Sequence, residues 1–389
     1  RRIVVISSDA QVGEDLGYLG GKPNFRKYLA GGTRILNVRS IYPSVTFPAH
    51  ATMITGCYPE HHGVTSNSQF PVFTDPVPWT WNASFLKRED IFRLAKKAGK
   101  TTAAVLWPVT VGNDAIDYHV ADYWAQGSET DEQAFADAGA NAEVMEIIRK
   151  NASLAAPCWR NHPGRDEFGI ACARDIILRY APEVLFVHPA NIDAARHAGG
   201  VFGPHVNVAL DALDRWIGML GTALEDKGVL DETDLFLVSD HGQMDVRRVI
   251  GLNVLFAEKG WLAFGGNGSV QGWKAYCVSN GMKELLQEGL YGYSHIYTEE
   301  EARVEEHLGG DFAFVLETDG YTAFGDYWNR PLVRPLDNHD YRFGRATHGY
   351  LPSKGPQPMM VAKGPHIKKN TFLDGFGIVD EAPTFARIL

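Results

Sequence analysis

The chain opens with R-R-I-V-V-I-S-S-D-A at residues 1–10, where a short apolar run gives way to polar residues. Such a run is typical of a strand that is buried on both faces, as in a parallel sheet. Asp9 would then follow the carboxyl end of this strand, at the edge where open α/β sheets bind ligands. Similar apolar runs occur at 35–42, 101–106, 184–188, 234–238 and 359–362.

Helical patterns alternate with these runs. They cover 24–30, 90–98, 169–180 and 206–227, and a last helix begins near residue 380. Strands that alternate with helices favour a parallel sheet with helices packed on its faces. We therefore expect an α/β fold with a mostly parallel central sheet and helices on both faces.

Two regions interrupt this alternation, 109–165 and 251–337. We interpret the first, which has a helical pattern at 131–150, as an insertion near the active site. The second has short alternating stretches at 274–278 and 312–317 and a helix near 299–307, so we interpret it as a small inserted α/β cap. The core would then comprise 1–108, 166–250 and 338–389.

The overall charge restricts the partners. The 389 residues carry a formal net charge of −10, so a broad positive surface for a nucleic-acid duplex is not expected. A small anionic ligand would need local positive charge, such as a bound metal ion. Four scattered cysteines without a C-x-x-C pair argue against a thiolate zinc cluster.

We expect neither a membrane-spanning segment nor a signal peptide. No apolar stretch of about 18 residues predicts a membrane span, and the apolar run at the start is too short for a signal peptide. We therefore expect no membrane partner and a cytoplasmic location, and the oligomeric state stays open.

Residues 40–70 read S-I-Y-P-S-V-T-F-P-A-H-A-T-M-I-T-G-C-Y-P-E-H-H-G-V-T-S-N-S-Q-F. Thr46 lies between Pro43 and Pro48, and a helical run follows to residue 56. Proline suits the first turn of a helix, so Thr46 would lie at a helix N-terminus, where backbone N–H groups stabilise an anion such as phosphate. The alternative is an ordinary proline-flanked loop with a capping threonine.

Acidic residues and histidines recur where the apolar runs stop. Each has an ordinary explanation by itself, such as a helix cap or a solvated pair. Together they form two sets of carboxylate and imidazole ligands, which suit zinc or a similar divalent ion. Two ions about 4 Å apart could stabilise an in-line phosphoryl displacement. The candidate ligands are Asp9, Asp193, His197, Asp240, His241 and His348.

These elements, in this order, resemble the alkaline phosphatase superfamily, and within it the type I phosphodiesterase/nucleotide pyrophosphatase branch. The resemblance runs through Asp9, Y-P-S-V-T-F-P-A-H, T-G-x-Y-P-x-x-H-G, D-x-x-x-H at 193–197, S-D-H-G at 239–242 and T-H-G at 347–349. It implies an alkaline-phosphatase-like fold and a metal-dependent hydrolase.

The resemblance also implies a role for each matching residue. One zinc ion would be held by Asp193, His197 and His348, and the other by Asp9, Asp240 and His241, with manganese as an alternative metal. Thr46 would contact the metal and act as the nucleophile, giving a phospho-threonine intermediate that water then hydrolyses. Asn67 and the N–H of Phe47 would stabilise the charge on the phosphoryl group.

Departures from the pattern bear on the substrate. Threonine in place of serine, and no arginine in the turn, favour small phosphodiesters such as nucleotides over monoesters. The first strand ends in Asp9-Ala10-Gln11 rather than D-G-x-R, and Trp107-Pro108 matches a W-P of the pyrophosphatases. Substrate contacts are therefore expected from Phe47, Asn67 and Trp107.

Three alternatives remain open. A phosphonoacetate hydrolase, which breaks a C–P bond, has the same ligand set but needs a positive side chain for the carboxylate; Arg160 and Lys274 are candidates. A phosphomonoesterase with the same metal site is the second alternative. The third is a metal-binding relative without catalysis.

Overall fold

The computed structural model describes residues 1–69, 78–155, 161–264, 270–273, 293–325, 327–337 and 344–389. Its centre is an eight-stranded sheet with the strand order β17-β2-β16-β6-β1-β5-β3-β4. The strands are β1 (Arg2–Ser7), β2 (Thr33–Ile35), β3 (Thr102–Val105), β4 (Tyr118–Val120), β5 (Val184–Val187), β6 (Thr233–Val238), β16 (Met360–Lys363) and β17 (Thr371–Phe372).

The sheet is mixed but mostly parallel, as predicted. β1 pairs in parallel with both β5 and β6, and β3 pairs in parallel with β5 and β4. The exception is β16, which runs antiparallel between β2 and β6. The carboxyl ends of β6, β1, β5 and β3 therefore meet at one edge of the sheet.

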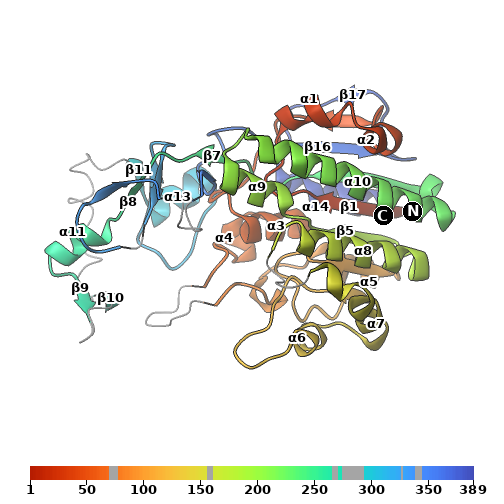
Figure 1. The fold of residues 1–389 in the computed structure, drawn as a ribbon, viewed down its shortest axis with the longest axis horizontal. Helices are drawn as coiled ribbons and strands as arrows, with labels where there is room; N and C mark the ends of the chain where they lie inside the picture. Colours follow the sequence, from red (N-terminus) through yellow and green to blue (C-terminus); the bar gives the residue numbers. More distant parts are fainter. Residues whose placement is uncertain (70–77, 156–160, 265–269, 274–292, 326, 338–343) are drawn as a thin grey trace.

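Helices cover both faces of the sheet, which confirms the predicted layers (Figure 1). Successive residues of β1 alternate between two hydrophobic clusters, because side chains of a strand point to opposite faces. One face packs against α1 (Leu16–Leu19), α2 (Pro23–Tyr28), α7 (Ala142–Asn151), α8 (Gly164–Tyr180) and α10 (Pro204–Asp226). The other packs against α3 (Thr46–Thr55), α5 (Ile91–Lys97) and α14 (Glu381–Ile388).

Two predicted elements differ in extent. The strand expected at 35–42 ends at Ile35, because the backbone of the next residues bonds to loops: the Val38 N–H donates to Pro358 O and the Arg39 N–H to Phe376 O. The helical pattern at 131–150 divides into α6 (Asp131–Asp137) and α7, separated by Gly139 with a φ of 120°.

The segment 109–165 is more closely joined to the core than an insertion would be. Its strand β4 extends the central sheet beside β3. Its helix α7 packs on α8, and Val144 and Ile148 belong to the main hydrophobic cluster. The segment therefore contributes a strand and a helix to the central layers, and the domain boundary at residue 109 stays a prediction.

The region 251–337 forms small sheets and helices to one side of the central sheet, away from both termini (Figure 1). The stretch expected at 274–278 lies outside the described residues, whereas the helix near 299–307 is present as α13. The elements of this side region, together with the adjoining β8, are β8 (Arg248–Ile250), β9 (Leu262–Phe264), β10 (Val270–Trp273), β11 (Tyr293–Thr298), β12 (Phe314–Thr318), β13 (Thr322–Phe324), β14 (Val333–Pro335), α11 (Asn253–Glu258) and α13 (Glu299–Glu306).

The described part of the chain contains no helix with both the length and the apolar character needed to cross a bilayer.

Candidate active site

Helix α3 begins at Thr46. Val45 before it is extended, with φ −129° and ψ 154°, and the first helical bond runs from the Ala49 N–H to Val45 O over 3.1 Å. Pro48 lies in the first turn, where its missing N–H has no partner to lose. The Thr46 hydroxyl thus lies at the positive end of the helix dipole, as the proline spacing predicted.

The six predicted ligands come together from separate elements. Asp9 follows β1, and Asp240 and His241 follow β6, so neighbouring strands bring them to the same edge. Asp193 and His197 lie one turn apart on α9 (Asn191–Gly199), which follows β5. His348 follows β15 (Ala346–Thr347), which pairs with β7 (Met244–Asp245) just after His241.

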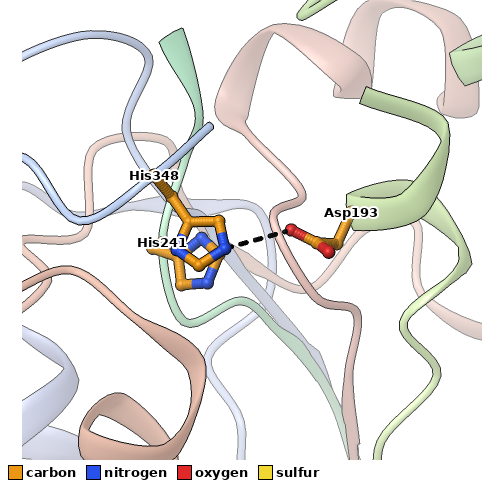
Figure 2. A group of neighbouring side chains, drawn as sticks. All are labelled: Asp193, His241 and His348. Atoms are coloured by element: carbon orange, nitrogen blue, oxygen red, sulfur yellow. Dashed lines mark ion pairs between the residues drawn. The ribbon is translucent and has the colours of Figure 1, made fainter. Parts of the chain in front are cut away.

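Within this cluster, two groups of side chains could each hold a metal ion. Asp193, His241 and His348 form one group, and Asp9, Asp240 and His241 form the other, with ligand atoms within 4.8 Å of one another. Figure 2 shows Asp193 facing the stacked rings of His241 and His348; His348 Nε2 lies 3.7 Å from Asp193 Oδ1. Because His241 belongs to both groups, they lie side by side, as a two-ion site requires.

The grouping differs in one respect from the predicted ligand sets. The prediction assigned His197 to one ion and His241 to the other. In the structure His241 lies between the groups, while His197 Nε2 is 3.4 Å from Asp193 Oδ1. All six residues are nevertheless in one cluster.

The hydrogen bonds of the three histidines fit metal ligation. Nδ1 of His197 is 2.7 Å from Ala346 O, that of His241 is 3.2 Å from Gly242 O, and that of His348 is 3.2 Å from Ser44 O. Each Nδ1–H therefore donates to a backbone carbonyl, so the Nε2 lone pair points toward carboxylates. Lone pairs and carboxylates that face one another need a cation between them.

The carboxylates show the same need for positive charge. Burial, together with mutual repulsion, raises the pKa of Asp9, and burial also raises the pKa of Asp240. Asp9 Oδ1 and Asp240 Oδ2 are buried and accept no hydrogen bond from the described residues. Burial lowers the pKa of His241 to about 4, which keeps its ring neutral and able to bind a metal. Two divalent ions fit this donor set.

Thr46 lies beside both groups, with its Oγ1 3.3 Å from His241 Nε2. Asn67 is next to it, but the geometry corrects one prediction. Asn67 Oδ1 accepts the Phe47 N–H over 2.8 Å, so that N–H is engaged and does not point to a phosphoryl group as expected. Because the Asn67 side-chain oxygen accepts this bond and its N–H₂ has no acceptor among the described residues, the N–H₂ can donate to a ligand.

A cavity of about 260 Å³ contains this site. Phe47, Trp79 and Trp124 line part of it; the Phe47 and Trp79 rings lie 5.3 Å apart, as do those of Trp79 and Trp124. Phe47 thus lines the cavity, and its contact with a substrate stays a prediction. Trp107 is not placed for such a contact: it is fully buried and packs edge-on against His50, 4.8 Å away, so it supports the site from behind.

Sequence reasoning missed several residues that support the ligands. His188 Nε2 lies 3.0 Å from Asp9 Oδ2, and the Gln243 side-chain N–H₂ donates to Asp193 Oδ1 over 2.5 Å. His188 directly follows β5, so the strand-end argument could have found it. Asp122, His162 and Arg165 also line the cavity, and no spacing in the sequence singles them out.

Comparisons with known proteins identify the family. The family described as type I phosphodiesterase/nucleotide pyrophosphatase matches residues 3–325. An uncharacterized pyrophosphatase/phosphodiesterase of Schizosaccharomyces pombe is 25% identical over 269 residues, covering 65% of this chain and 47% of that protein. Ectonucleotide pyrophosphatase/phosphodiesterase family member 1 of Mus musculus is 27% identical over 254 residues, covering 64% of this chain and 25% of that protein. The chain thus spans about half or less of the length of these relatives.

Among solved structures, murine ectonucleotide pyrophosphatase/phosphodiesterase 5, inactive and in complex with AMP, matches with a TM-score of 0.70 and 17% identity. The match covers 100% of this chain and 94% of that one, which shows a shared fold. The match to the family over most of the chain, together with the fold and the ligand cluster, places this protein in the type I phosphodiesterase/nucleotide pyrophosphatase family of the alkaline phosphatase superfamily.

Proposed function

We propose that this hydrolase cleaves phosphodiester or pyrophosphate bonds of small nucleotide-type substrates, with Thr46 as nucleophile and two divalent ions as cofactors. One observation carries the proposal: the Thr46 hydroxyl lies at the start of α3, 3.3 Å from His241, which belongs to both candidate metal groups. A nucleophile, a helix N-terminus and two cation sites therefore meet at one point.

Two bound divalent ions would supply positive charge that favours the ionised hydroxyl and neutralises phosphoryl oxygens. The donor set suits zinc best and also accepts manganese. Asp193, His197 and His348 would surround one ion and Asp9, Asp240 and His241 the other, with His241 at their boundary.

Side chains and the backbone of the protein carry out the attack and stabilise the charge that develops. Thr46 Oγ1 forms a bond to phosphorus as the leaving oxygen departs, giving a phospho-threonine, and water then hydrolyses that ester and restores the hydroxyl. The start of α3 stabilises the developing negative charge, and the Asn67 amide donates to a phosphoryl oxygen.

The nucleotide preference is supported by the aromatic wall and by a structural neighbour. Phe47, Trp79 and Trp124 offer faces and edges on which a planar base could stack. The murine structure of the same fold holds AMP. A cytoplasmic location remains part of the proposal and is tested by fractionating the source cells.

A second candidate function, hydrolysis of phosphonoacetate, has one specific observation in its favour. Its substrate carboxylate requires a cation; Arg160 and Lys274 lie outside the described residues, but Arg165 lines the cavity. Any phosphomonoesterase activity would need the same cation.

The deciding experiment compares bis-p-nitrophenyl phosphate, p-nitrophenyl phosphate and phosphonoacetate as substrates of the metal-loaded protein. We expect the diester to be hydrolysed fastest and its hydrolysis to require Thr46. Faster release of phosphate from phosphonoacetate or from the monoester would establish an alternative. A metal-loaded protein without any of these activities would be a binding protein.

A further inference from the structure

The cavity has a second wall, formed by Asp122, His162 and Arg165. We infer that Arg165 is a specificity-determining residue that binds a second anionic group of the substrate, namely the phosphate next to the one attacked in a pyrophosphate bond. The inference rests on the proposed function and names a preference within it. A simple diester lacks this second group.

Arg165 is held firmly at the cavity. It is the second residue of α8, its backbone N–H donates to Asn161 O over 2.9 Å, and its guanidinium forms an ion pair with Asp122. Only 13% of the Arg165 side chain and 6% of the Asp122 side chain are exposed. A guanidinium fixed by a carboxylate loses little conformational entropy when it binds a ligand.

The start of α8 is also tied to the metal site. Asp166, the next residue, is buried and accepts the Ala190 N–H over 2.6 Å, at the start of the helix that carries Asp193. His162 Nδ1 lies 2.6 Å from the other oxygen of Asp166. Asp166 therefore connects the start of α8, which carries Arg165, to the start of α9, which carries the candidate ligands Asp193 and His197.

The chemistry of the pair favours phosphate as its ligand. A guanidinium has five N–H donors in a plane. Among the described residues only Asp122 accepts a hydrogen bond from the Arg165 side chain, so further donors are left for a second acceptor. Two parallel N–H groups match two phosphate oxygens, which makes arginine a strong phosphate binder. The opposing explanation is that the Arg165–Asp122 pair only joins α8 to the loop after β4.

The test measures binding without turnover. The zinc-loaded Thr46→Ala protein and its Thr46→Ala/Arg165→Gln derivative are titrated with two ligands by calorimetry. These are thymidine 5′-diphosphate, which has the second phosphate, and the p-nitrophenyl ester of thymidine 5′-monophosphate, which does not. We expect the Arg165→Gln change to raise the Kd of the diphosphate about 10- to 100-fold and the Kd of the ester less than about 3-fold.

Two further variants separate specificity from folding. Arg179→Gln, on the same helix but paired with exposed Glu146, should leave both Kd values unchanged. Arg165→Lys keeps the positive charge but lacks the planar guanidinium, so it should raise the Kd of the diphosphate by an intermediate factor. If the Arg165→Gln protein shows no cooperative melting transition, the Arg165→Lys protein is used in its place.

If the Kd values of both ligands rose by the same factor, or if the Kd of the diphosphate did not rise, the proposed role of Arg165 would be wrong. The proposed function fails separately, if the wild-type protein turns over neither ligand. In that case the Kd ratio of the two ligands still decides whether Arg165 recognises the second phosphate.

Discussion

On one wall of the cavity, Asp9 and Asp240 form no ion pair with a lysine or arginine among the described residues, while on the other wall Arg165 is already paired with a carboxylate. Burial raises the pKa of both Asp9 and Asp240, and repulsion by Asp240 raises the pKa of Asp9 further. Across the cavity Arg165 pairs with Asp122, and His162 lies beside Asp166. The difference indicates that the first wall requires ions to be complete, whereas the second is pre-formed to recognise a substrate.

Removal of the metal ions should have the largest effect on activity and stability, through the first wall. We expect a strong chelator to abolish hydrolysis and to lower the melting temperature, because the carboxylates of the first wall lose their counter-charge. Activity should return with Zn²⁺ or Mn²⁺. Elemental analysis of active protein should give two equivalents per chain, and a fully active protein with fewer would contradict the two-ion site.

The Thr46→Ala substitution should have the second-largest effect, on turnover. Without the hydroxyl there is no nucleophile, and we expect kcat on a diester to fall by on the order of 10³-fold or more, with metal content unchanged. Thr46→Ser, which keeps a hydroxyl, should retain much of the activity. Thr55→Ala, at the other end of α3, serves as the control. Near-normal turnover by Thr46→Ala would exclude the proposed intermediate.

Gln243→Leu should have a smaller effect, on affinity for one ion. Gln243 donates to Asp193 Oδ1 and so orients that carboxylate; its loss should weaken metal binding by about 10- to 100-fold. Competition against a chelator of known affinity measures this. Gln357→Leu, whose amide donates to the Gly355 carbonyl in a loop, is the matched control. Identical metal affinity in both variants would show that Gln243 is not needed.

The smallest expected effect concerns Glu381 on α14, behind Asp240. Burial, reinforced by Asp240, raises the pKa of Glu381 well above its usual range, and neither carboxylate oxygen has a hydrogen-bond partner in the described part of the chain. The stability contributed by such a group is present below its unfolded-state pKa and is lost as the pH rises through its folded-state pKa.

Glu381→Gln should therefore raise the melting temperature at pH 8 by roughly 2 to 4 °C and change it less at pH 5. The control substitution Glu232→Gln, at an exposed residue, should leave the melting temperature unchanged at both pH values. An equal shift at both pH values would mean that packing, not ionisation, is responsible.

The first wall was largely predictable from the sequence. Asp9, Asp240 and His241 lie within three residues of the ends of buried strands that are neighbours in the sheet. Thr46 was predicted from the two prolines that flank it and the helical run that follows. In an α/β sheet these local signals converge in space, because parallel strands share one carboxyl edge.

The second wall was not predictable in this way. Arg165 and Asp122 are 43 residues apart and have no periodicity, and the segment that carries them was interpreted as an insertion although its strand β4 joins the sheet. Trp107 shows the opposite error: a plausible motif residue proved to be buried behind His50.

The sequence by itself determined the α/β layers, the nucleophile candidate and the six candidate ligands, because hydrophobic periodicity and strand ends are local properties. Only the tertiary structure decided which ligands share an ion, that Asn67 engages the Phe47 N–H, and that Arg165 reaches the cavity. These features depend on contacts between segments that are distant in the sequence. Such contacts form only when the folded chain packs and its charges pair.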